Sequence, residues 1–232
     1  MRNLESSVLD AMANLVVFRT ADIAGRVEAA PVAVARTLAR LARNRQVTRL
    51  SRGLWADTRH PRFSPYIVVP YLVGTEPGAS SCYVSFVSAL SLRGMISQIP
   101  AAIHVAVLEQ RRLVVTPIGT FRFHQMDRAL FDGFTAGDPY GRFELATPVK
   151  ALLDTLYMAV RRGRRFAHLP EVELPRAVTD VAMQRWIARI TFPALQTAVN
   201  ARWQALRRTT RQNAEAGELA VARPPRGRRR RS

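Results

Sequence analysis

The chain has 232 residues, 48% of them hydrophobic, so it can bury a core and is not a wholly disordered protein. It carries 35 basic and 17 acidic residues, a net charge of +18, and Lys150 is its only lysine. This arginine surplus indicates a polyanionic partner, either nucleic acid or an anionic membrane surface. Part of the arginine surplus has an alternative explanation, a genomic preference for arginine codons.

Three features of the sequence indicate the cellular compartment of the protein. Cys82 is the single cysteine, which excludes an intramolecular disulfide and fits a reducing cytoplasm. Glu5 and Asp10 lie where a signal peptide would be apolar. The most apolar stretch, residues 66–74, is too short to span a bilayer and contains Pro70. We therefore expect a cytoplasmic protein that has no membrane partner.

The first 60 residues carry the pattern of three helices and a short ribbon. Leu4, Val8, Met12 and Leu15 recur at helical spacing, and Thr20 is a suitable N-cap for a second helix. A third helix starts near Pro31. Two strands, 46–50 and 53–57, follow, and Gly53 can take a positive φ in the turn between them. This order predicts a winged helix-turn-helix domain over residues 1–60.

The third helix is expected to have two chemically different faces. Val34, Leu38 and Leu41 form an apolar stripe, and three arginines repeat at the same spacing on the far side. Residues 31–56 hold six arginines and no acidic residue, whereas a merely solvated helix would mix charges. The sequence therefore predicts a helix in the major groove of double-stranded DNA and a ribbon along the phosphates. The predicted DNA-binding residues are Arg36, Thr37, Arg40 and Arg43 on the helix and Asn44, Arg45, Arg49, Arg52 and Gly53 after it. The ribbon is predicted to pack on the helices through Leu50, Leu54 and Trp55.

The rest of the chain has a mixed pattern, which makes the whole an α+β protein. Residues 57–65 contain two prolines and no periodicity, as a linker would. Buried strands are expected at 66–73 and 101–109, and a hairpin at 111–126. The expected helices cover residues 83–95, 146–160, 180–190 and 192–210. From Arg207 the apolar pattern fades, so residues 207–232 are predicted to be an arginine-rich disordered tail.

Four motifs of the second half occur in a recognisable order: "YVSFVSALSLRGMISQIP", "TPIGTFRFHQM", "ATPVKALLDTLY" and "FAHLPEVELP". With the predicted winged helix, they resemble the AbiEi-like antitoxins and transcriptional regulators of abortive-infection type IV toxin–antitoxin systems over residues 5–205. Similar proteins usually carry glutamate at the positions of Val87 and Val149 and histidine near Arg93. The antitoxin-domain candidates are Ser85, Ser88, Arg93, Lys150 and Asp154.

The resemblance implies a function in antiviral defence. The N-terminal domain would bind promoter repeats and repress its own gene. The domain at residues 61–206 would oppose a nucleotidyltransferase-like toxin without forming a stable complex with it. Two alternatives stay open: a stand-alone regulator without a toxin partner, and an interaction protein that binds RNA or neutralises a toxin. Dimerisation or cooperative loading on DNA is compatible with paired half-sites.

The sequence offers little that indicates an enzyme. Its four histidines, at positions 60, 104, 124 and 168, have no metal-ligand spacing. Four carboxylates precede Lys150, but Pro148 occupies the position at which an E-x-K nuclease motif needs its acid. Lys150 is expected to pair with Glu144 or Asp154. We therefore predict no catalytic residue, no metal and no cofactor.

Overall fold

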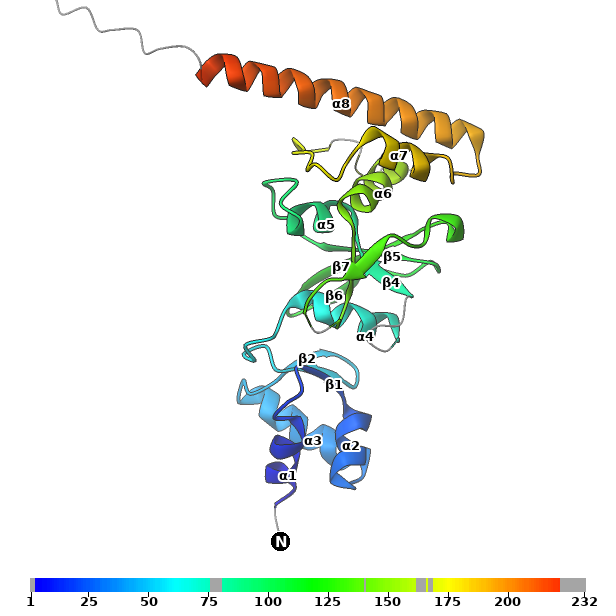
Figure 1. Ribbon diagram of the computed structural model, residues 1–232. Helices are drawn as coiled ribbons and strands as arrows, with labels where there is room; N and C mark the ends of the chain where they lie inside the picture. Colours follow the sequence, from blue (N-terminus) through cyan, green and yellow to red (C-terminus); the bar gives the residue numbers. More distant parts are fainter. Residues whose placement is uncertain (1–2, 76–80, 140, 162–165, 167–168, 222–232) are drawn as a thin grey trace, which may run out of the picture.

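The computed structural model describes residues 3–75, 81–139, 141–161, 166 and 169–221, with side chains up to residue 213. Across them the chain is an α+β protein with two separate sheets. An N-terminal unit, residues 3–56, lies at one end of the molecule and helix α8 crosses the other end (Figure 1). The second unit, from residue 65 onward, contains the larger sheet.

The N-terminal unit consists of three helices and a small antiparallel sheet of order β1-β3-β2. Its core joins residues of all three helices to Val47 and Trp55. The strand β1 was not expected from the sequence, because three residues are too few to show an alternating pattern. The elements are α1 (Leu4–Met12), β1 (Val17–Arg19), α2 (Thr20–Val27), α3 (Pro31–Arg43), β2 (Thr48–Ser51) and β3 (Leu54–Ala56).

The start of α2 differs from the prediction by one residue. Arg19 is the N-cap residue, and its backbone N–H donates to Asp22 Oδ2 at 2.8 Å. Thr20 is the first helical residue instead. Its hydroxyl oxygen accepts a hydrogen bond of 2.9 Å from Trp55 Nε1. The threonine therefore ties the ribbon to α2 and does not cap the helix.

Strand β3 of the ribbon is buried on both of its faces. Trp55 packs with the three helices, as predicted. Leu50, Leu54 and Ala56 belong instead to the core of the second unit, so the prediction that Leu50 and Leu54 anchor the ribbon on the helices is wrong. The physical reason is strand alternation: neighbouring side chains point to opposite faces, and the second unit covers the face away from the helices.

The segment predicted as a linker is fixed by contacts on both sides. The backbone N–H of Asp57 donates to the carbonyl of Val16 at 2.9 Å, and the Thr48 and Thr58 hydroxyls lie 3.1 Å apart. Phe63 packs on the core of the second unit. The two units are therefore joined by a packed segment rather than by a free tether.

The second unit begins with a helical segment where the sequence predicted a strand. Residues 66–73 form the 3-10 helix η1 (Pro65–Val68) and helix α4 (Val69–Val73). Ser64 caps η1 by accepting a hydrogen bond from the Tyr66 backbone N–H, and Pro70 lies early in α4. Proline is tolerated in a first helical turn but removes a donor from a sheet, so local chemistry favours the helix over the strand.

The larger sheet is mixed, with the order β6-β7-β5-β4-β9-β8. Strands β5 and β7 pair in parallel, as do β4 and β9, and β4 pairs with β5 in antiparallel fashion. The predicted strand at 101–109 and the hairpin turning at residues 117–119 are confirmed. The strands are β4 (Cys82–Val84), β5 (Ile103–Val107), β6 (Val114–Thr116), β7 (Gly119–Gln125), β8 (Phe134–Ala136) and β9 (Glu144–Ala146), with the 3-10 helix η2 (Arg128–Leu130) after β7.

In the part of this unit that the structure describes, four further helices follow: α5 (Phe86–Leu92), α6 (Pro148–Val160), α7 (Asp180–Ile187) and α8 (Pro193–Val221). The predicted helix at 83–95 starts only at Phe86, because Cys82–Val84 pairs as a strand. Helix α6 packs against α5, α7 and α8, and every residue from Val149 to Ala159 is buried. It is the central helix of the unit (Figure 1).

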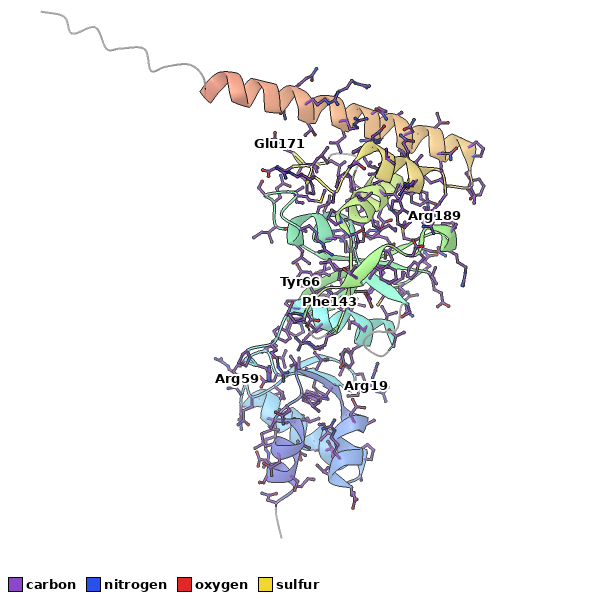
Figure 2. All side chains as sticks on the ribbon, in the orientation of Figure 1. Arg19, Arg59, Tyr66, Phe143, Glu171 and Arg189 are labelled. Atoms are coloured by element: carbon purple, nitrogen blue, oxygen red, sulfur yellow. The ribbon has the colours of Figure 1, made fainter. Side chains whose placement is uncertain are left out.

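Helix α8 extends beyond the predicted start of the tail. It continues from Arg207 to Val221, and the Asn213 side chain donates to Glu171 Oε1 at 2.7 Å. Figure 2 shows Glu171 beneath this helix. The prediction of disorder from residue 207 is therefore wrong up to residue 221, and residues 222–232 lie outside the described part of the chain.

Candidate nucleic-acid interface

Helix α3 has the two faces that its sequence predicts. Val34, Leu38 and Leu41 are fully buried. Arg36, Arg40 and Arg43 are exposed on the opposite side. The exposed face also carries Val32, which is 63% exposed, and Ala39. The outward surface of α3 is thus a row of arginines separated by small apolar residues.

Thr37 does not belong to this surface, so its assignment to the groove-facing residues is wrong. It is only 8% exposed, and its hydroxyl donates to the carbonyl of Ala33 at 3.1 Å. Thr37 follows Val34 by three residues and precedes Leu41 by four, which is the spacing of one helix face. The same geometry that buries the apolar stripe therefore buries the threonine.

The arginines of the N-terminal unit differ in how they are neutralised. Arg40 Nη2 lies 2.5 Å from Glu5 Oε2 of α1, in an ion pair whose side chains are 50% and 28% exposed. Four guanidiniums have no hydrogen bond or ion pair with any residue that the structure describes: those of Arg36, Arg43, Arg45 and Arg52. The carboxylate that meets Arg40 comes from the same unit and not from the second half of the chain.

The turn after α3 adds two of the predicted residues. Asn44 is the C-cap, Arg45 has a φ of 58°, and the Gln46 backbone N–H closes the end by donating to the Leu41 carbonyl at 2.9 Å. Arg45, one of the DNA-binding residues predicted after the helix, lies in this left-handed turn and not on either strand of the ribbon. Its side chain is exposed beside the last turn of α3.

The ribbon itself carries the remaining candidates. Arg49 pairs in register with Trp55, and its guanidinium lies 5.7 Å from the centre of the indole ring. Arg52 is exposed in the turn, and Gly53 has the expected positive φ, 72°. Because Trp55 faces the helices, Arg49 lies on the same side of the ribbon as α3.

The N-terminal unit is held against the second unit by side chains at their boundary. Arg19 Nη2 donates to the Tyr71 carbonyl at 3.4 Å, and its guanidinium lies 5.9 Å from the Tyr71 ring centre. Arg59 Nη2 donates to the Gln46 carbonyl at 3.3 Å. Figure 2 shows Arg19 and Arg59 at this boundary, with the stacked Tyr66 and Phe143 rings on the other side.

A second group of candidates forms the buried polar cluster, defined by Tyr83, Ser85, Lys150 and Asp154. All four side chains are fully buried. Asp154 Oδ2 accepts from Ser85 Oγ at 2.7 Å and from Tyr83 OH at 3.1 Å. Lys150 Nζ donates to Tyr83 OH at 2.7 Å and pairs with Asp154. The sequence singled out three of these residues but missed Tyr83, since nothing in its spacing linked it to α6.

Burial dominates the electrostatics of this cluster. It raises the pKa of Asp154 and of Tyr83 and lowers the pKa of Lys150, because the charged forms lose their hydration. The attraction between Lys150 and Asp154 opposes both of these shifts, because it lowers the pKa of the carboxyl group and raises the pKa of the ammonium group. Of the two predicted partners of Lys150, the structure selects Asp154, at the i+4 position, and not Glu144. The cluster connects β4 to α6 and has no exposed surface to offer a partner.

The other antitoxin-domain candidates lie apart from this cluster. Ser88 Oγ donates to the Ala102 carbonyl at 3.2 Å and accepts from the His104 backbone N–H at 2.9 Å. Arg93 Nε donates to the Ala146 carbonyl at 3.2 Å, and its Nη2 to Thr135 Oγ1 at 3.4 Å. Ser88 therefore ties α5 to the start of β5, and Arg93, the C-cap of α5, ties its end to β8 and β9.

Two histidines that looked unrelated in the sequence meet in the structure. His104 Nδ1 and His124 Nε2 are 2.8 Å apart, and the two rings are stacked with centres 5.1 Å apart. The adjacent strands β5 and β7 bring them together. His60 Nδ1 accepts from the Arg62 backbone N–H, and His168 lies outside the described residues. The described part of the chain has no group of three side chains able to hold a metal ion.

Comparison with known proteins relates this chain to others through its fold. No protein-family model and no curated protein matches it. It is similar to the crystal structure of the RV2827C protein from Mycobacterium tuberculosis, with a TM-score of 0.54 and 17% identity over 89% of this chain and 81% of that one. A likeness at this identity shows a shared α+β fold. Within the described residues, none of the helices combines the length and the apolar character that crossing a bilayer requires.

Proposed function

We propose that this protein is a DNA-binding transcriptional repressor whose N-terminal unit is a winged helix. Helix α3 enters the major groove, and the ribbon β2–β3 is the wing. The observation that carries this proposal is the set of exposed guanidiniums of Arg36, Arg43, Arg45 and Arg52, which have no partner among the described residues. Such cations replace the counterions of a nucleic-acid backbone.

The length of α3 and the small apolar residues between its exposed arginines suit the major groove of DNA. Its 13 residues span about 20 Å at 1.5 Å per residue. The B-DNA major groove, about 12 Å wide, admits one helix. Arg36 and Arg43 would reach guanine edges, and exposed Val32 would contact a thymine methyl group. Arg45 and Arg52 would bind phosphates on either side.

The role of the second unit rests on the resemblance of its motifs to AbiEi-like antitoxins. In this proposal the cytoplasmic protein represses its own promoter and opposes a nucleotidyltransferase-like toxin without a stable complex. Because Ser85, Lys150 and Asp154 are buried, they would support the antitoxin surface through the fold rather than contact the toxin. A stand-alone regulator is the alternative. Co-expression of this protein with a nucleotidyltransferase-like toxin separates the two, because only an antitoxin restores growth.

Fluorescence anisotropy with duplex DNA from the promoter of the protein's own gene tests the DNA-binding proposal. Arg36→Ala should weaken binding by about 1–3 kcal/mol and relax sequence choice. Arg52→Ala should weaken binding to all duplexes alike and reduce the slope of log affinity against log salt by about 1. Arg208→Ala, an exposed change on α8 at the far end of the molecule, is the charge-matched control.

Two results would contradict this proposal. Unchanged binding by both Arg36→Ala and Arg52→Ala would remove α3 and the ribbon from the interface. Tighter binding to structured RNA than to duplex DNA of equal length, in the same gel-shift series, would favour the alternative of an RNA-binding protein.

A further inference from the structure

A groove of about 850 Å³ runs beneath helix α8, and we call it the acidic groove. Residues 169–173 form one wall, and the part of α8 from Arg202 to Asn213 forms the other. Figure 2 shows Glu171 at this place beneath the helix. The lining part of α8 is about 17 Å long at 1.5 Å per residue. The acidic groove can therefore take about five residues of an extended peptide, at about 3.3 Å each.

Two carboxylates line the acidic groove. Glu171 and Glu173 are exposed, whereas Val172 between them is buried, so both glutamates lie on the outer side of this segment. Glu171 Oε1 accepts a hydrogen bond of 2.7 Å from the Asn213 side chain. The Glu173 backbone N–H donates to the Met95 carbonyl at 2.8 Å. One carboxylate is thus fixed against α8, and the backbone of the other is fixed to the loop after α5.

These carboxylates are not neutralised. Neither Glu171 nor Glu173 forms an ion pair with any residue that the structure describes. Arg202 is the one cationic side chain among the described residues that line the acidic groove. The lining therefore carries a net negative charge on a protein whose overall charge is +18. Such a surface favours a cationic occupant.

The acidic groove also presents apolar surface. Leu169, Pro170 and Leu206 line it and are half-buried, and Ala205 is exposed. An arginine side chain suits both kinds of surface, because its methylene stem packs on apolar groups while its guanidinium binds a carboxylate. The chemistry of the lining therefore matches a peptide that is rich in arginine.

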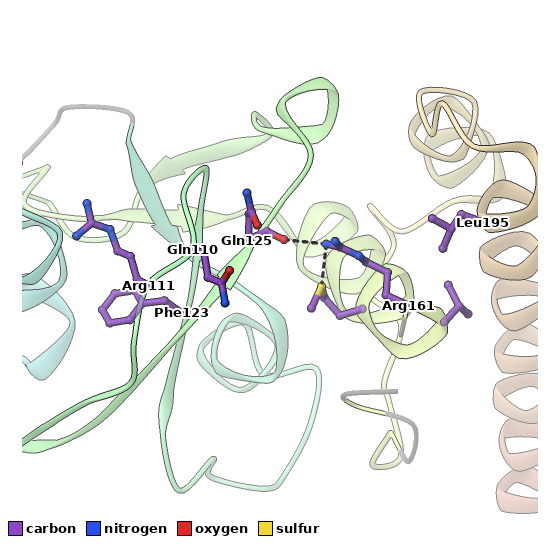
Figure 3. A pocket seen from close by; sticks show the side chains of 8 residues that line it. Gln110, Arg111, Phe123, Gln125, Arg161 and Leu195 are labelled. Atoms are coloured by element: carbon purple, nitrogen blue, oxygen red, sulfur yellow. Dashed lines mark hydrogen bonds between the residues drawn. The ribbon is translucent and has the colours of Figure 1, made fainter. Parts of the chain in front are cut away.

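A second hollow on the same unit has the opposite charge. It lies between β7, the end of α6 and the start of α8, where Figure 3 shows Leu195. Arg161 Nη1 donates there to the Gln125 carbonyl at 2.9 Å (Figure 3). None of the described residues that line this hollow is an aspartate or a glutamate. It would repel an arginine-rich peptide, so charge directs such a peptide to the acidic groove.

The chain itself contains a segment of matching chemistry directly after α8. Residues 222–232, which lie outside the described part, contain six arginines, two prolines and no acidic residue. Helix α8 continues beyond Asn213 to Val221, about 12 Å. Eleven extended residues span up to about 36 Å, which is enough to return along α8 and reach the acidic groove. Pro224 and Pro225 disfavour a further helical turn and so favour a change of direction.

We propose that residues 222–232 fold back beneath α8 and dock in the acidic groove. Their guanidiniums pair with Glu171 and Glu173, and their arginine stems and prolines pack on Leu169 and Leu206. The segment is tethered to α8, so docking is intramolecular and benefits from a high effective concentration. A docked segment is withheld from other polyanions, and salt releases it by screening the ion pairs. This proposal does not depend on α3 and the ribbon.

Paramagnetic relaxation in the full chain tests the proposal. A nitroxide on Ser232→Cys reports which backbone amides the segment approaches, and Cys82 stays unlabelled at neutral pH because its thiol is buried. Ser97 and Glu173 line the acidic groove from segments other than α8. We expect their amide signals to lose most of their intensity at low salt and to recover it at high salt.

Charge removal in the acidic groove provides the matched comparison. The double variant Glu171→Gln, Glu173→Gln should restore both amide signals at low salt, because it removes the negative charge. Glutamine retains an oxygen for the Asn213 hydrogen bond and both side chains are exposed, so the unfolding temperature should be unchanged. Glu109→Gln, an exposed change on the loop after β5, is the control and should leave the signals attenuated.

Three results would overturn the proposal. The first is full intensity of the Ser97 and Glu173 signals in the nitroxide-labelled chain with no further change. The second is equal attenuation in that chain and in the double variant. The third comes from a mixture of two copies, one that bears the nitroxide and one that is isotope-labelled for detection. Attenuation in this mixture would show that the segment of a second copy occupies the acidic groove.

Discussion

Lys150 and Asp154 face each other across one turn of α6 and form an ion pair in the interior of the second unit. Neither side chain is exposed. The hydroxyls of Tyr83 and Ser85 complete the coordination of the carboxylate. A charged pair in such a place is compensated only while every member is present, because each ion has given up its hydration.

Removal of one partner of this pair should be strongly destabilising. In Asp154→Ala the Lys150 ammonium remains buried without a counter-charge, and the expected loss is about 3–5 kcal/mol of unfolding free energy. Chemical denaturation monitored by circular dichroism measures it. Glu5→Ala breaks the half-exposed pair with Arg40 and serves as the control, with an expected loss of about 0–1 kcal/mol. Equal losses in the two variants would contradict a compensated interior pair.

Glu5 also provides a test of the proposed DNA surface. Its carboxylate neutralises Arg40 on the exposed face of α3. Glu5→Gln keeps a hydrogen-bond acceptor and removes the negative charge, so duplex DNA should bind a few times more tightly and with a steeper salt dependence. Anisotropy titrations at several salt concentrations measure both quantities. Weaker binding by the variant would show that the carboxylate positions Arg40 for DNA instead.

Cys82 predicts a stability change at alkaline pH. Burial raises the pKa of its thiol to about 11, from 9.0 for the ordinary group. The folded state therefore keeps the proton over a range where the unfolded chain releases it. The protonated, buried thiol therefore contributes to the free energy of unfolding, and this contribution is fully present below pH 9 and is lost as the pH rises towards 11. Denaturation of the unaltered protein and of Cys82→Ala from pH 8 to 11 isolates this effect, since the difference between them should shrink.

A difference in stability that does not change between pH 8 and 11 would contradict a raised thiol pKa. Labelling gives an independent readout. Only the thiolate reacts with iodoacetamide, so Cys82 should react slowly at pH 8 until the protein is unfolded.

Two glycines offer a matched pair of substitutions with opposite expected signs. Gly133 has a φ of +77°, and an added Cβ would lie 2.5 Å from Cζ2 of Trp186. Gly133→Ala should therefore destabilise the protein by more than about 1 kcal/mol. Gly25 lies in α2 with nothing within 4 Å of an added Cβ, so Gly25→Ala should stabilise it by about 0.5–1 kcal/mol. Thermal melts of both variants measure the shifts, and a shared sign would contradict the structural explanation.

The predictable parts of the fold were those fixed by local patterns. The apolar stripe of α3, the hairpin turn at residues 117–119 and the i+4 pairing of Lys150 with Asp154 all follow from periodicity or spacing along one element. Thr37 shows the limit of this reasoning. Its polarity suggested the groove-facing side, yet its position on the helix places it with the buried residues.

Contacts between distant segments were not predictable. The hydrogen bond of the Tyr83 hydroxyl to Asp154 and the stacked rings of His104 and His124 each depend on elements that lie far apart in the chain. The burial of Leu50 and Leu54 against the second unit is of the same kind. A period of two identifies opposite faces of a strand but does not reveal what covers each face.

By itself the sequence determined the charge of the protein, its α+β class and the arginine-rich face of α3, because composition and local periodicity act within one element at a time. The tertiary structure alone decided which arginines are neutralised, which polar groups are enclosed and where a hollow remains. Those outcomes depend on packing between segments. The free energy of packing depends on the two surfaces that meet, so it does not follow from the sequence of either segment alone.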